Sequence, residues 1–397
     1  MVLFSVLNII LLSVLMRDRS LFKPQIFIAY LTPLFLFAVW GFEYSSGGIN
    51  FFISDEISYA AETFSGFPDL NDRFLWLLVN YWVANYDIYL HGLPLKLMNI
   101  PIFVGFFYLL DKIFPSNRNI LLLFMLPYLP FSAVFNLRDM AIWFFSTLSI
   151  YLSSKSSWKS CSCFLPLIVL FLLRPFAAML ISGLIIIVKT PEILLFIKET
   201  ANATTRMMRI IVVVVAWTCL LLMAYPQLHN KIETYSAWYE YTTTEGETKH
   251  IEGLPDPILT GNGKLDFAIA SVRYFLTPMP HSLIKRISTG GSENWGLFDD
   301  LVRLVNQTGY YLILHYLLFN SKYLMGAMRA LSKTQKMLLI SMSMYWPIYS
   351  FHLYGVTHQR LKLPLQIALF FLAMAVHQKK QEFKPEILCR YFCLKKI

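Results

Sequence analysis

The sequence predicts an all-α membrane protein that crosses the bilayer about eleven times, or roughly ten to twelve. Hydrophobic residues make up 56% of the chain and charged residues 15%, whereas soluble domains carry about 25% charge. Several apolar stretches of roughly 15–20 residues or more, long enough to span a bilayer, recur along the chain. They are residues 25–42, 119–137, 161–188, 209–225, 337–354 and 363–377.

The chain begins with a further apolar stretch, residues 1–16, which basic residues follow rather than precede. Arg17, Arg19 and Lys23 come after it. A cleaved signal peptide has the opposite order and ends in a small-residue cleavage site. We therefore expect residues 1–16 to form a first membrane-spanning helix that stays in the protein.

The distribution of Lys and Arg predicts the orientation, because cytoplasmic loops of membrane proteins are enriched in both. With the N-terminus outside and the C-terminus in the cytoplasm, the cytoplasmic segments hold 21 of the 34 Lys and Arg residues but only 6 of the 24 Asp and Glu residues. This asymmetry also accounts for the net charge of +10, so we expect no nucleic-acid partner. The segments are 17–24, 111–118, 154–160, 189–209, 320–336 and 378–397.

The stretch 161–188 is interrupted by Arg174 and Pro175 near its middle. One long tilted helix is the alternative, but we expect two short spans or a re-entrant hairpin that turns at Arg174. The residue before a proline is biased away from the helical region. A single span would also put the basic segment 189–209 outside.

Two outside segments are longer than simple turns within this single membrane domain, which covers residues 1–397. Segment 43–90 is acidic in its first half, and its second half predicts an amphipathic helix in the outer interface, interrupted by Asn80, Asn85 and Asp87. Segment 226–303 is turn-rich and then aromatic. Loops of this length are usually functional or disordered.

Motifs for nucleotide binding, metalloprotease and serine hydrolase chemistry are missing from the sequence. The cysteines lie in or beside apolar stretches or in the basic C-terminal tail, so we expect neither a disulfide framework nor a zinc site. They are Cys161, Cys163, Cys219, Cys389 and Cys393. We expect no metal and no cofactor.

Arginines on the predicted outer side are the first candidates for function. Arg138, Arg174 and Arg360 each separate two apolar stretches, and Arg273 lies in the second long outside segment. An arginine near the bilayer centre costs about 2.5–3.5 kcal/mol on insertion scales. A guanidinium suits phosphate and carboxylate oxygens, and a lipid-linked phosphate lies at this level of the membrane. The alternative is an arginine that snorkels to the interface beside a helix end.

Asp139 directly follows Arg138. Neighbouring residues on a helix do not face each other, so we expect Asp139 to pair with a different arginine. The two charges would then end one span and begin the next while facing an outside cavity.

The stretch "FFISDEISYAAE" (51–62) supplies carboxylates. If it is helical, Asp55 and Tyr59 lie one turn apart on one face. Asp55 or Glu56 could act as a general base on a sugar hydroxyl. The alternative is a helix start capped by Ser54. His281, in "PMPHS", is a further candidate.

These stretches together resemble one family. "NLRDMAIWFF" (136–145), "LLRPFA" (172–177) and "HQRLKLPLQIALFFLA" (358–373) resemble motifs of bacterial O-antigen polymerases of the Wzy type and of related exopolysaccharide polymerases. "SDEISYA" (54–60) resembles an early acidic motif of these proteins and of GT-C-type glycosyltransferases, and "RYFLTPMPHSL" (273–283) resembles a loop element of the same group. This chain departs from the pattern at Lys362, where an aromatic–Arg pair is commoner.

The resemblance implies a multi-pass enzyme of the bacterial inner membrane, with its N-terminus in the periplasm and its C-terminus in the cytoplasm. It would transfer a growing glycan from undecaprenyl diphosphate to a new lipid-linked repeat unit at the periplasmic face. Its partners would be the undecaprenyl-diphosphate-linked oligosaccharide, membrane lipids and a chain-length regulator protein. Catalytic roles would fall to Asp55, Glu56, Arg138, Arg174 and Arg360, and substrate binding to Tyr59, Asp139, Arg273 and His281.

Two alternatives remain open from the sequence. The first is a GT-C-type glycosyltransferase that adds one sugar from a polyprenyl-phosphate donor and uses the same early carboxylate. The second is a flippase for the lipid-linked oligosaccharide. Such transporters usually contain internal repeats, and this sequence shows none.

Overall fold

In the computed structural model of the chain, residues 23–198 and 260–393 are described, with isolated positions between them. Short gaps fall at 48, 53–54, 70–72, 87–92, 156–161, 163, 261, 290–295 and 352–358. The expected spans 1–16 and 209–225 lie outside the described residues. Every regular element in the described part of the chain is a helix, which confirms the all-α prediction.

The first half of the described chain contains two long helices and many short ones. They are α2 (Pro24–Ser45), α3 (Asp55–Ser65), α4 (Phe74–Tyr86), α5 (Leu93–Leu97), α6 (Asn99–Ile113), η2 (Asn117–Ile120), α7 (Leu121–Met125), α8 (Tyr128–Ser132), α9 (Asp139–Lys155), α10 (Phe164–Leu173) and α11 (Pro175–Lys198).

The second half contains α13 (Gly263–Leu276), α14 (Pro280–Ser288), α15 (Gly296–Phe319), η4 (Ser321–Tyr323), α16 (Leu324–Ala330), α17 (Lys333–Ser343), α18 (Tyr345–Phe351) and α19 (Gln359–Cys393). Within the described residues, three helical segments are long and apolar enough to cross a membrane. They are Pro24–Ser45, Leu93–Ile113 and Arg360–Glu382. The chain is therefore an all-helical protein with the character of a membrane protein.

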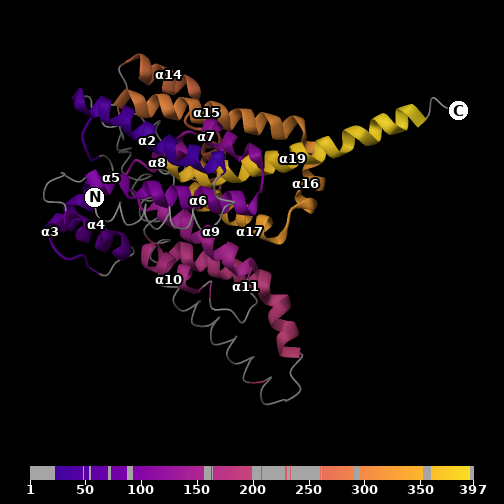
Figure 1. Cartoon of the computed structure of the whole chain (residues 1–397), viewed down its shortest axis with the longest axis horizontal. Coiled ribbons are helices and arrows are strands. Elements are labelled where there is room, and N and C mark those ends of the chain that lie inside the picture. Colours follow the sequence, from indigo (N-terminus) through magenta and orange to yellow (C-terminus); the bar gives the residue numbers. More distant parts are fainter. Residues whose placement is uncertain are drawn as a thin grey trace.

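Helices α6, α9 and α19 lie near the middle of the bundle, and their axes follow its long direction (Figure 1). Helix α9 packs against α6, α10, α11 and α17, while α19 packs against α15, α16 and α17. Gly105 of α6 faces the Phe144 ring of α9, and a Cβ at Gly105 would lie 3.0 Å from that ring. A small residue lets the two backbones approach closely, as is common between membrane helices.

The expected span 119–137 is not one helix. It is divided into η2, α7 and α8, and the backbone from Ala133 to Arg138 is not helical. Pro127 explains the first break, because the residue before a proline, here Leu126, is pushed out of the helical region. The expected span 337–354 is likewise divided into α17 and α18, since Pro347 cannot donate to the carbonyl four residues earlier.

The stretch 161–188 forms two helices, as the Arg174–Pro175 pair predicts. Helix α10 ends at Leu173 and α11 begins at Pro175. Both helices pack against α9, and Arg138, next to the first residue of α9, donates to the Leu173 carbonyl (3.4 Å). The break at Arg174 therefore lies beside the start of α9.

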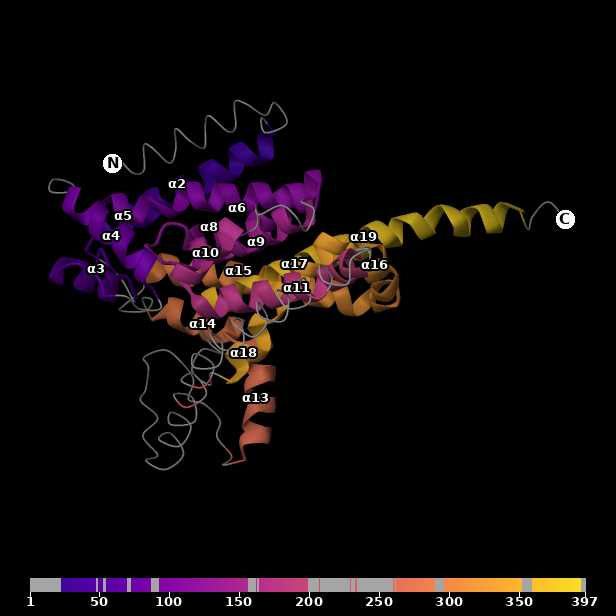
Figure 2. The ribbon, with the colours of Figure 1, turned by 90° about the horizontal axis from the view of Figure 1, so that it is seen from below.

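Most of the described residues in the two long outside segments are helical. Helix α13 packs on α18 and stands away from the main bundle (Figure 2). Helix α15 begins at Gly296, inside the segment 226–303 that the sequence predicts as a loop. Glu43 lies near the C-terminal end of α2. Its carboxylate accepts a hydrogen bond from the Leu297 amide (2.6 Å) and so binds the first turn of α15.

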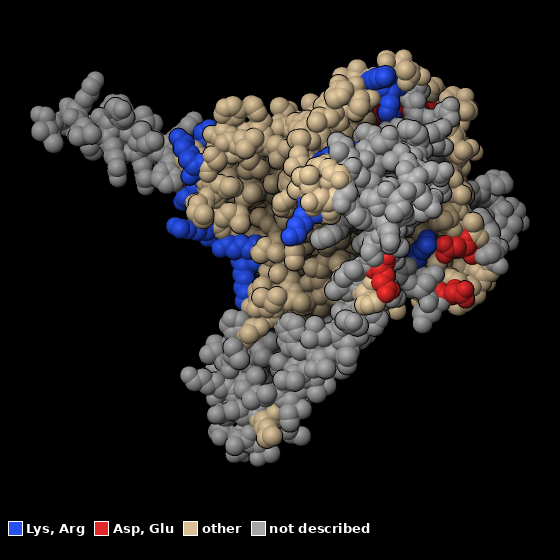
Figure 3. All heavy atoms as spheres, turned by 180° about the vertical axis from the view of Figure 1, so that it is seen from behind, with Lys and Arg blue, Asp and Glu red and all other residues tan. Residues whose placement is uncertain are grey.

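Segments predicted to be cytoplasmic meet at one end of the bundle. Hydrogen bonds join four of them there: Lys23 to Asp111 (2.7 Å), Gln335 to the Ile113 carbonyl (2.9 Å) and Lys380 to Asn320 (2.8 Å). We call this the basic end. A group of Lys and Arg side chains is visible there, where α19 projects from the bundle, while Asp and Glu side chains lie toward the opposite end (Figure 3).

Candidate functional site

In the non-helical segment 133–138, residues 133–137 are buried, so their backbone must find hydrogen-bond partners inside the protein. Asn99, the first residue of α6, provides two of them. Its side-chain amide donates to the carbonyl oxygens of Phe135 (2.7 Å) and Leu137 (2.8 Å). One buried amide thus fixes the backbone immediately before Arg138.

Glu56 holds the same segment from the other side. Its Oε1 accepts from the Asn136 backbone amide (2.5 Å), and its Oε2 accepts from Lys96 Nζ (2.5 Å). The side chains of Glu56 and Lys96 are both fully buried. The ammonium group of Lys96 also lies 4.6 Å from the Trp40 ring centroid and 5.1 Å from that of Phe135. Both carboxylate oxygens of Glu56 are therefore occupied.

Asn80 extends this polar group toward α4. Its side-chain oxygen accepts from the Asn136 side-chain amide, and its own amide donates to the Trp76 carbonyl (2.8 Å). From the sequence, Asn80 is expected to be a polar interruption of a helix in the membrane interface. In the structure it is fully buried and points into the bundle. Asn85 has no described side chain, and Asp87 lies outside the described residues.

Asp139 lies between two arginines from other helices. Its Oδ1 is 4.0 Å from Arg174 Nη1, and its Oδ2 is 3.9 Å from Arg360 Nε. Arg138 turns instead to the Leu173 carbonyl. The expectation that Asp139 faces an arginine other than its neighbour is confirmed. We call Asp139 and the three arginines Arg138, Arg174 and Arg360 the arginine cluster.

Three helices begin at the arginine cluster: α9 at Asp139, α11 at Pro175 and α19 at Gln359. The N-terminus of a helix carries a partial positive charge, so cations are disfavoured there. Each of these helices nevertheless begins within one residue of an arginine. The described side chains of the cluster carry three positive charges and one negative charge. The site therefore has an excess of positive potential, which favours an anion.

The space inside the arginine cluster is small. A cavity lined by Asp139, Trp143, Arg174, Tyr345 and Arg360 has room for about one water molecule. The side chains of Arg174, Arg360 and Asp139 are partly accessible, at 26%, 13% and 17%. An anion would meet the guanidinium groups from this accessible side, and a larger one would require side-chain movement.

Lys362 and α13 support the start of α19. The hydroxyl of Tyr274 donates to the Leu361 carbonyl (2.8 Å). The ammonium group of Lys362 is buried and donates to both the carbonyl and the hydroxyl oxygen of Thr277. Arg273, the residue before Tyr274, lies near Lys362.

The other predicted site residues are spread more widely. Asp55 begins α3, and its side chain lies outside the described ones, as does Ser54 entirely. Tyr59 follows one turn later in α3 and is buried, with the Arg73 guanidinium 5.8 Å from its ring centroid. His281 is exposed on α14. No described contact joins His281 to the arginine cluster.

A second buried polar group, which the sequence analysis does not identify, lies on α15. Arg303 Nε is 2.5 Å from Asp299 Oδ2. The side chain of Asn306 accepts from the Tyr128 backbone amide (3.2 Å) and donates to Gln366 (3.0 Å). Tyr128 is the first residue of α8, so Asn306 binds an amide that the helix itself leaves unpaired.

Lys96, Asn99 and Lys362 are also absent from the predicted site. The available signal is a polar side chain inside or beside an apolar stretch, which is costly unless it has a partner. No group of three or more His, Cys, Asp or Glu side chains suited to a metal ion occurs among the described residues. Comparisons with family models, curated proteins and solved structures find no match to the chain.

Proposed function

We propose that this protein polymerises undecaprenyl-diphosphate-linked oligosaccharide repeat units at the periplasmic face of a bacterial inner membrane. The observation that carries the proposal is the convergence of Arg174 and Arg360 on Asp139, next to Arg138, at three helix N-termini. A diphosphate is a strong match for this excess of positive charge. The resemblance of the same stretches to O-antigen polymerases supplies the substrate class.

The distances within the cluster favour a binding role over a purely structural one. Charge-assisted hydrogen bonds are normally about 2.7–2.9 Å long. The contacts of Asp139 with Arg174 and Arg360 are 4.0 and 3.9 Å. The structural pair of Arg303 and Asp299, by contrast, is 2.5 Å. Asp139 therefore orients two guanidinium groups toward one point without binding them tightly.

In the proposed reaction, the acceptor hydroxyl attacks the anomeric carbon of the donor glycan. A new glycosidic bond forms as the bond between that carbon and the diphosphate oxygen breaks, and the diphosphate leaves with the bonding electrons. The arginines stabilise the charge that develops on it. A carboxylate accepts the hydroxyl proton, and this chemistry requires no nucleotide sugar.

We assign the role of general base to Asp55 and a positioning role to Glu56. Both oxygens of Glu56 are bonded, to Lys96 and to the Asn136 backbone. Because Glu56 fixes the segment that leads into Arg138 and Asp139, its loss would displace the cluster. Tyr59 and Arg273 contribute to substrate binding in this proposal. The periplasmic N-terminus, the cytoplasmic C-terminus and a chain-length regulator as partner belong to the same proposal.

Deletion of the gene in its host tests the function. Lipopolysaccharide is then analysed by gel after complementation with wild type, Arg138→Ala, Arg174→Ala or Asp55→Ala. The matched control is Arg329→Ala, because Arg329 is exposed on α16 at the basic end. We expect the deletion to leave core with a single repeat unit, the control to restore the ladder, and the three site variants to fail at normal membrane levels.

Other outcomes separate the alternatives. A full-length ladder that lacks one side-branch sugar would indicate the single-sugar transferase. Loss of all O-antigen, including the single-unit band, would indicate the flippase. Full rescue by all three site variants would show that the charges of the arginine cluster only mark helix ends and take no part in the function.

A further inference from the structure

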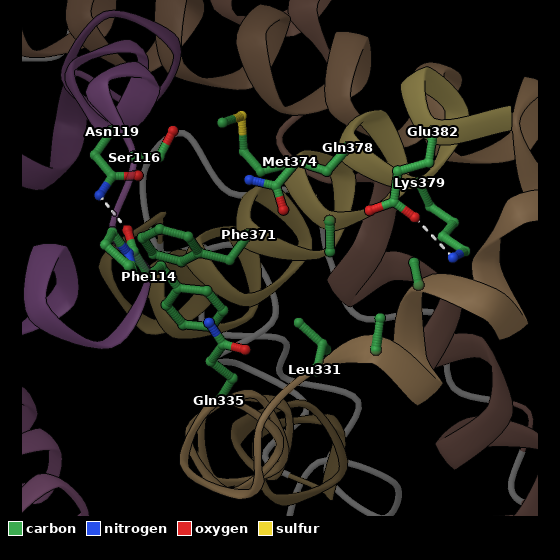
Figure 4. A pocket seen from close by; sticks show the side chains of 14 residues that line it. Phe114, Ser116, Asn119, Leu331, Gln335, Phe371, Met374, Gln378, Lys379 and Glu382 are labelled. Carbon is green, nitrogen blue, oxygen red and sulfur yellow. Dashed lines mark hydrogen bonds and ion pairs between the residues drawn. The ribbon is translucent and has the colours of Figure 1, made fainter. Parts of the chain in front are cut away.

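A cavity of about 190 Å³ lies at the basic end, far from the arginine cluster. It is enclosed by the turn that follows α6, the junction of α16 and α17, and the part of α19 that ends its apolar segment (Figure 4). Typical ligand pockets measure about 300–1,000 Å³. This cavity therefore suits a small polar headgroup better than a complete cofactor.

The lining divides into an apolar wall and polar groups. Phe114 and Phe371 stack with their ring centroids 4.2 Å apart and form the apolar wall with Met374 (Figure 4). Phe371 and Met374 belong to the segment Arg360–Glu382, which is long and apolar enough to cross a membrane. The cavity thus lies near the end of a candidate span, at the depth where lipid headgroups meet acyl chains.

Asn119 gives the cavity an unsatisfied acceptor. Its side chain is 1% exposed and lines the cavity. The amide nitrogen donates to Asp111 Oδ1 (2.9 Å) and to the Phe114 carbonyl (2.6 Å). Both partners are acceptors, so the amide cannot be reversed. Its oxygen has no hydrogen-bond partner among the described residues, and such a buried acceptor favours a ligand that brings a donor.

The surroundings of the cavity are basic, although its two charged lining residues pair with each other. Lys379 and Glu382 both line the cavity and form an ion pair (2.7 Å) (Figure 4), and Arg118, which precedes Asn119, lies on an exposed turn nearby. Lys and Arg side chains gather over this end of the molecule (Figure 3). Basic pockets between membrane helices on the cytoplasmic side bind anionic lipid headgroups.

We propose that this cavity binds the headgroup of an anionic phospholipid that also carries a hydroxyl group, of which phosphatidylglycerol is the simplest. A headgroup hydroxyl donates to Asn119 Oδ1, the phosphate lies among the surrounding basic side chains, and the acyl chains leave the cavity past Met374, which lines it and is partly exposed. The proposal does not depend on the proposed function, because the cavity lies at the other end of the bundle.

The test uses the purified full chain in detergent, with lipid binding measured by native mass spectrometry and by the thermal unfolding midpoint. Ala375→Leu fills the cavity without removing a hydrogen bond, because Ala375 lines it. Ala373→Leu is the matched control on the same helix, since Ala373 does not line the cavity. We expect wild type and Ala373→Leu to bind about tenfold more phosphatidylglycerol than phosphatidylcholine, and Ala375→Leu to lose this preference.

Two further probes identify the chemistry. Phosphatidic acid lacks the glycerol hydroxyls, and at a pH well above its second ionisation its phosphate carries no donor, so equal binding of phosphatidic acid at that pH would overturn the role of Asn119. If free glycerol 3-phosphate stabilises the protein to the same extent as the lipid, the proposal that the ligand is a lipid is overturned. An unchanged preference in Ala375→Leu would overturn the site itself. Gln378→Leu, which removes an exposed polar lining side chain, serves as the second variant if Ala375→Leu does not fold.

Discussion

Arg360 approaches the carboxylate of Asp139 to 3.9 Å, although the two residues lie in the first turns of helices from distant parts of the chain. Arg174 reaches the other oxygen of the same carboxylate at 4.0 Å. One acidic side chain therefore orients two guanidinium groups at contact distances longer than a hydrogen bond. This geometry leads to the first two predictions.

Replacing Arg174 or Arg360 with lysine should lower the proposed polymerising activity at least about tenfold, because a lysine keeps the charge but loses the planar pair of donors that fits a diphosphate. The measurement is glycan chain length in membranes with matched protein levels. Arg329→Lys is the control at the basic end and should leave activity unchanged. Wild-type activity in both site variants would show that only the charge matters there.

Replacing Asp139 with asparagine should lower the thermal unfolding midpoint, because the arginines then face one another without a carboxylate between them. Added pyrophosphate should raise the midpoint of Asp139→Asn more than that of wild type, since the carboxylate no longer competes for the guanidinium groups. The check is a titration of pyrophosphate against sulfate at constant ionic strength. If pyrophosphate shifts neither protein more than sulfate does, the cluster is not a diphosphate site.

Glu56 and Lys96 form a buried ion pair with no exposed surface, so the loss of both partners should cost less than the sum of the two separate losses. Removing one partner leaves an uncompensated buried charge, which costs about 3–5 kcal/mol. We expect Glu56→Gln and Lys96→Met each to destabilise the protein strongly. The double variant should be destabilised by less than the sum of the two.

The coupling free energy between Glu56 and Lys96 is obtained by unfolding wild type, the two single variants and the double variant in detergent. Additive effects would mean that Glu56 acts mainly through the Asn136 backbone amide and not through Lys96. Chain-length analysis of the same variants separates a positioning role from a structural one. A positioning role predicts reduced activity even where the protein level is normal.

The helices that could be predicted from the sequence are those with uninterrupted apolar composition. The spans 25–42 and 363–377 appear within α2 and α19. The break at Arg174 was also predictable, because a charge and a proline coincide there. The break at Leu126 was missed, although Pro127 follows it, because no charge interrupts the apolar stretch.

The residues of the candidate site were likewise only partly predictable from the sequence. Isolated arginines between apolar stretches are visible in the sequence, and adjacency on a helix excludes a pair between Arg138 and Asp139. The partners of Glu56 cannot be identified from the sequence, because Lys96 comes to it from α5 and Asn136 from the non-helical segment 133–138. In the sequence, Lys96 resembles an ordinary basic residue near the end of a span, and only the folded structure brings it to Glu56 of α3.

The last prediction concerns Gly309 of α15. A Cβ at this position would lie 2.0 Å from the Met125 carbonyl oxygen, which is the end of α7. Backbone cannot yield as a flexible side chain does, so Gly309→Ala should force α15 away from the broken helix and destabilise the protein by about 1–3 kcal/mol or more. Gly183→Ala is the matched control, because a Cβ at Gly183 in α11 meets nothing within 4 Å. Replacing a helical glycine there should stabilise slightly, by about 0.5–1 kcal/mol. Thermal unfolding midpoints in one detergent compare the two variants, and equal midpoints would show that α15 and α7 do not pack this closely.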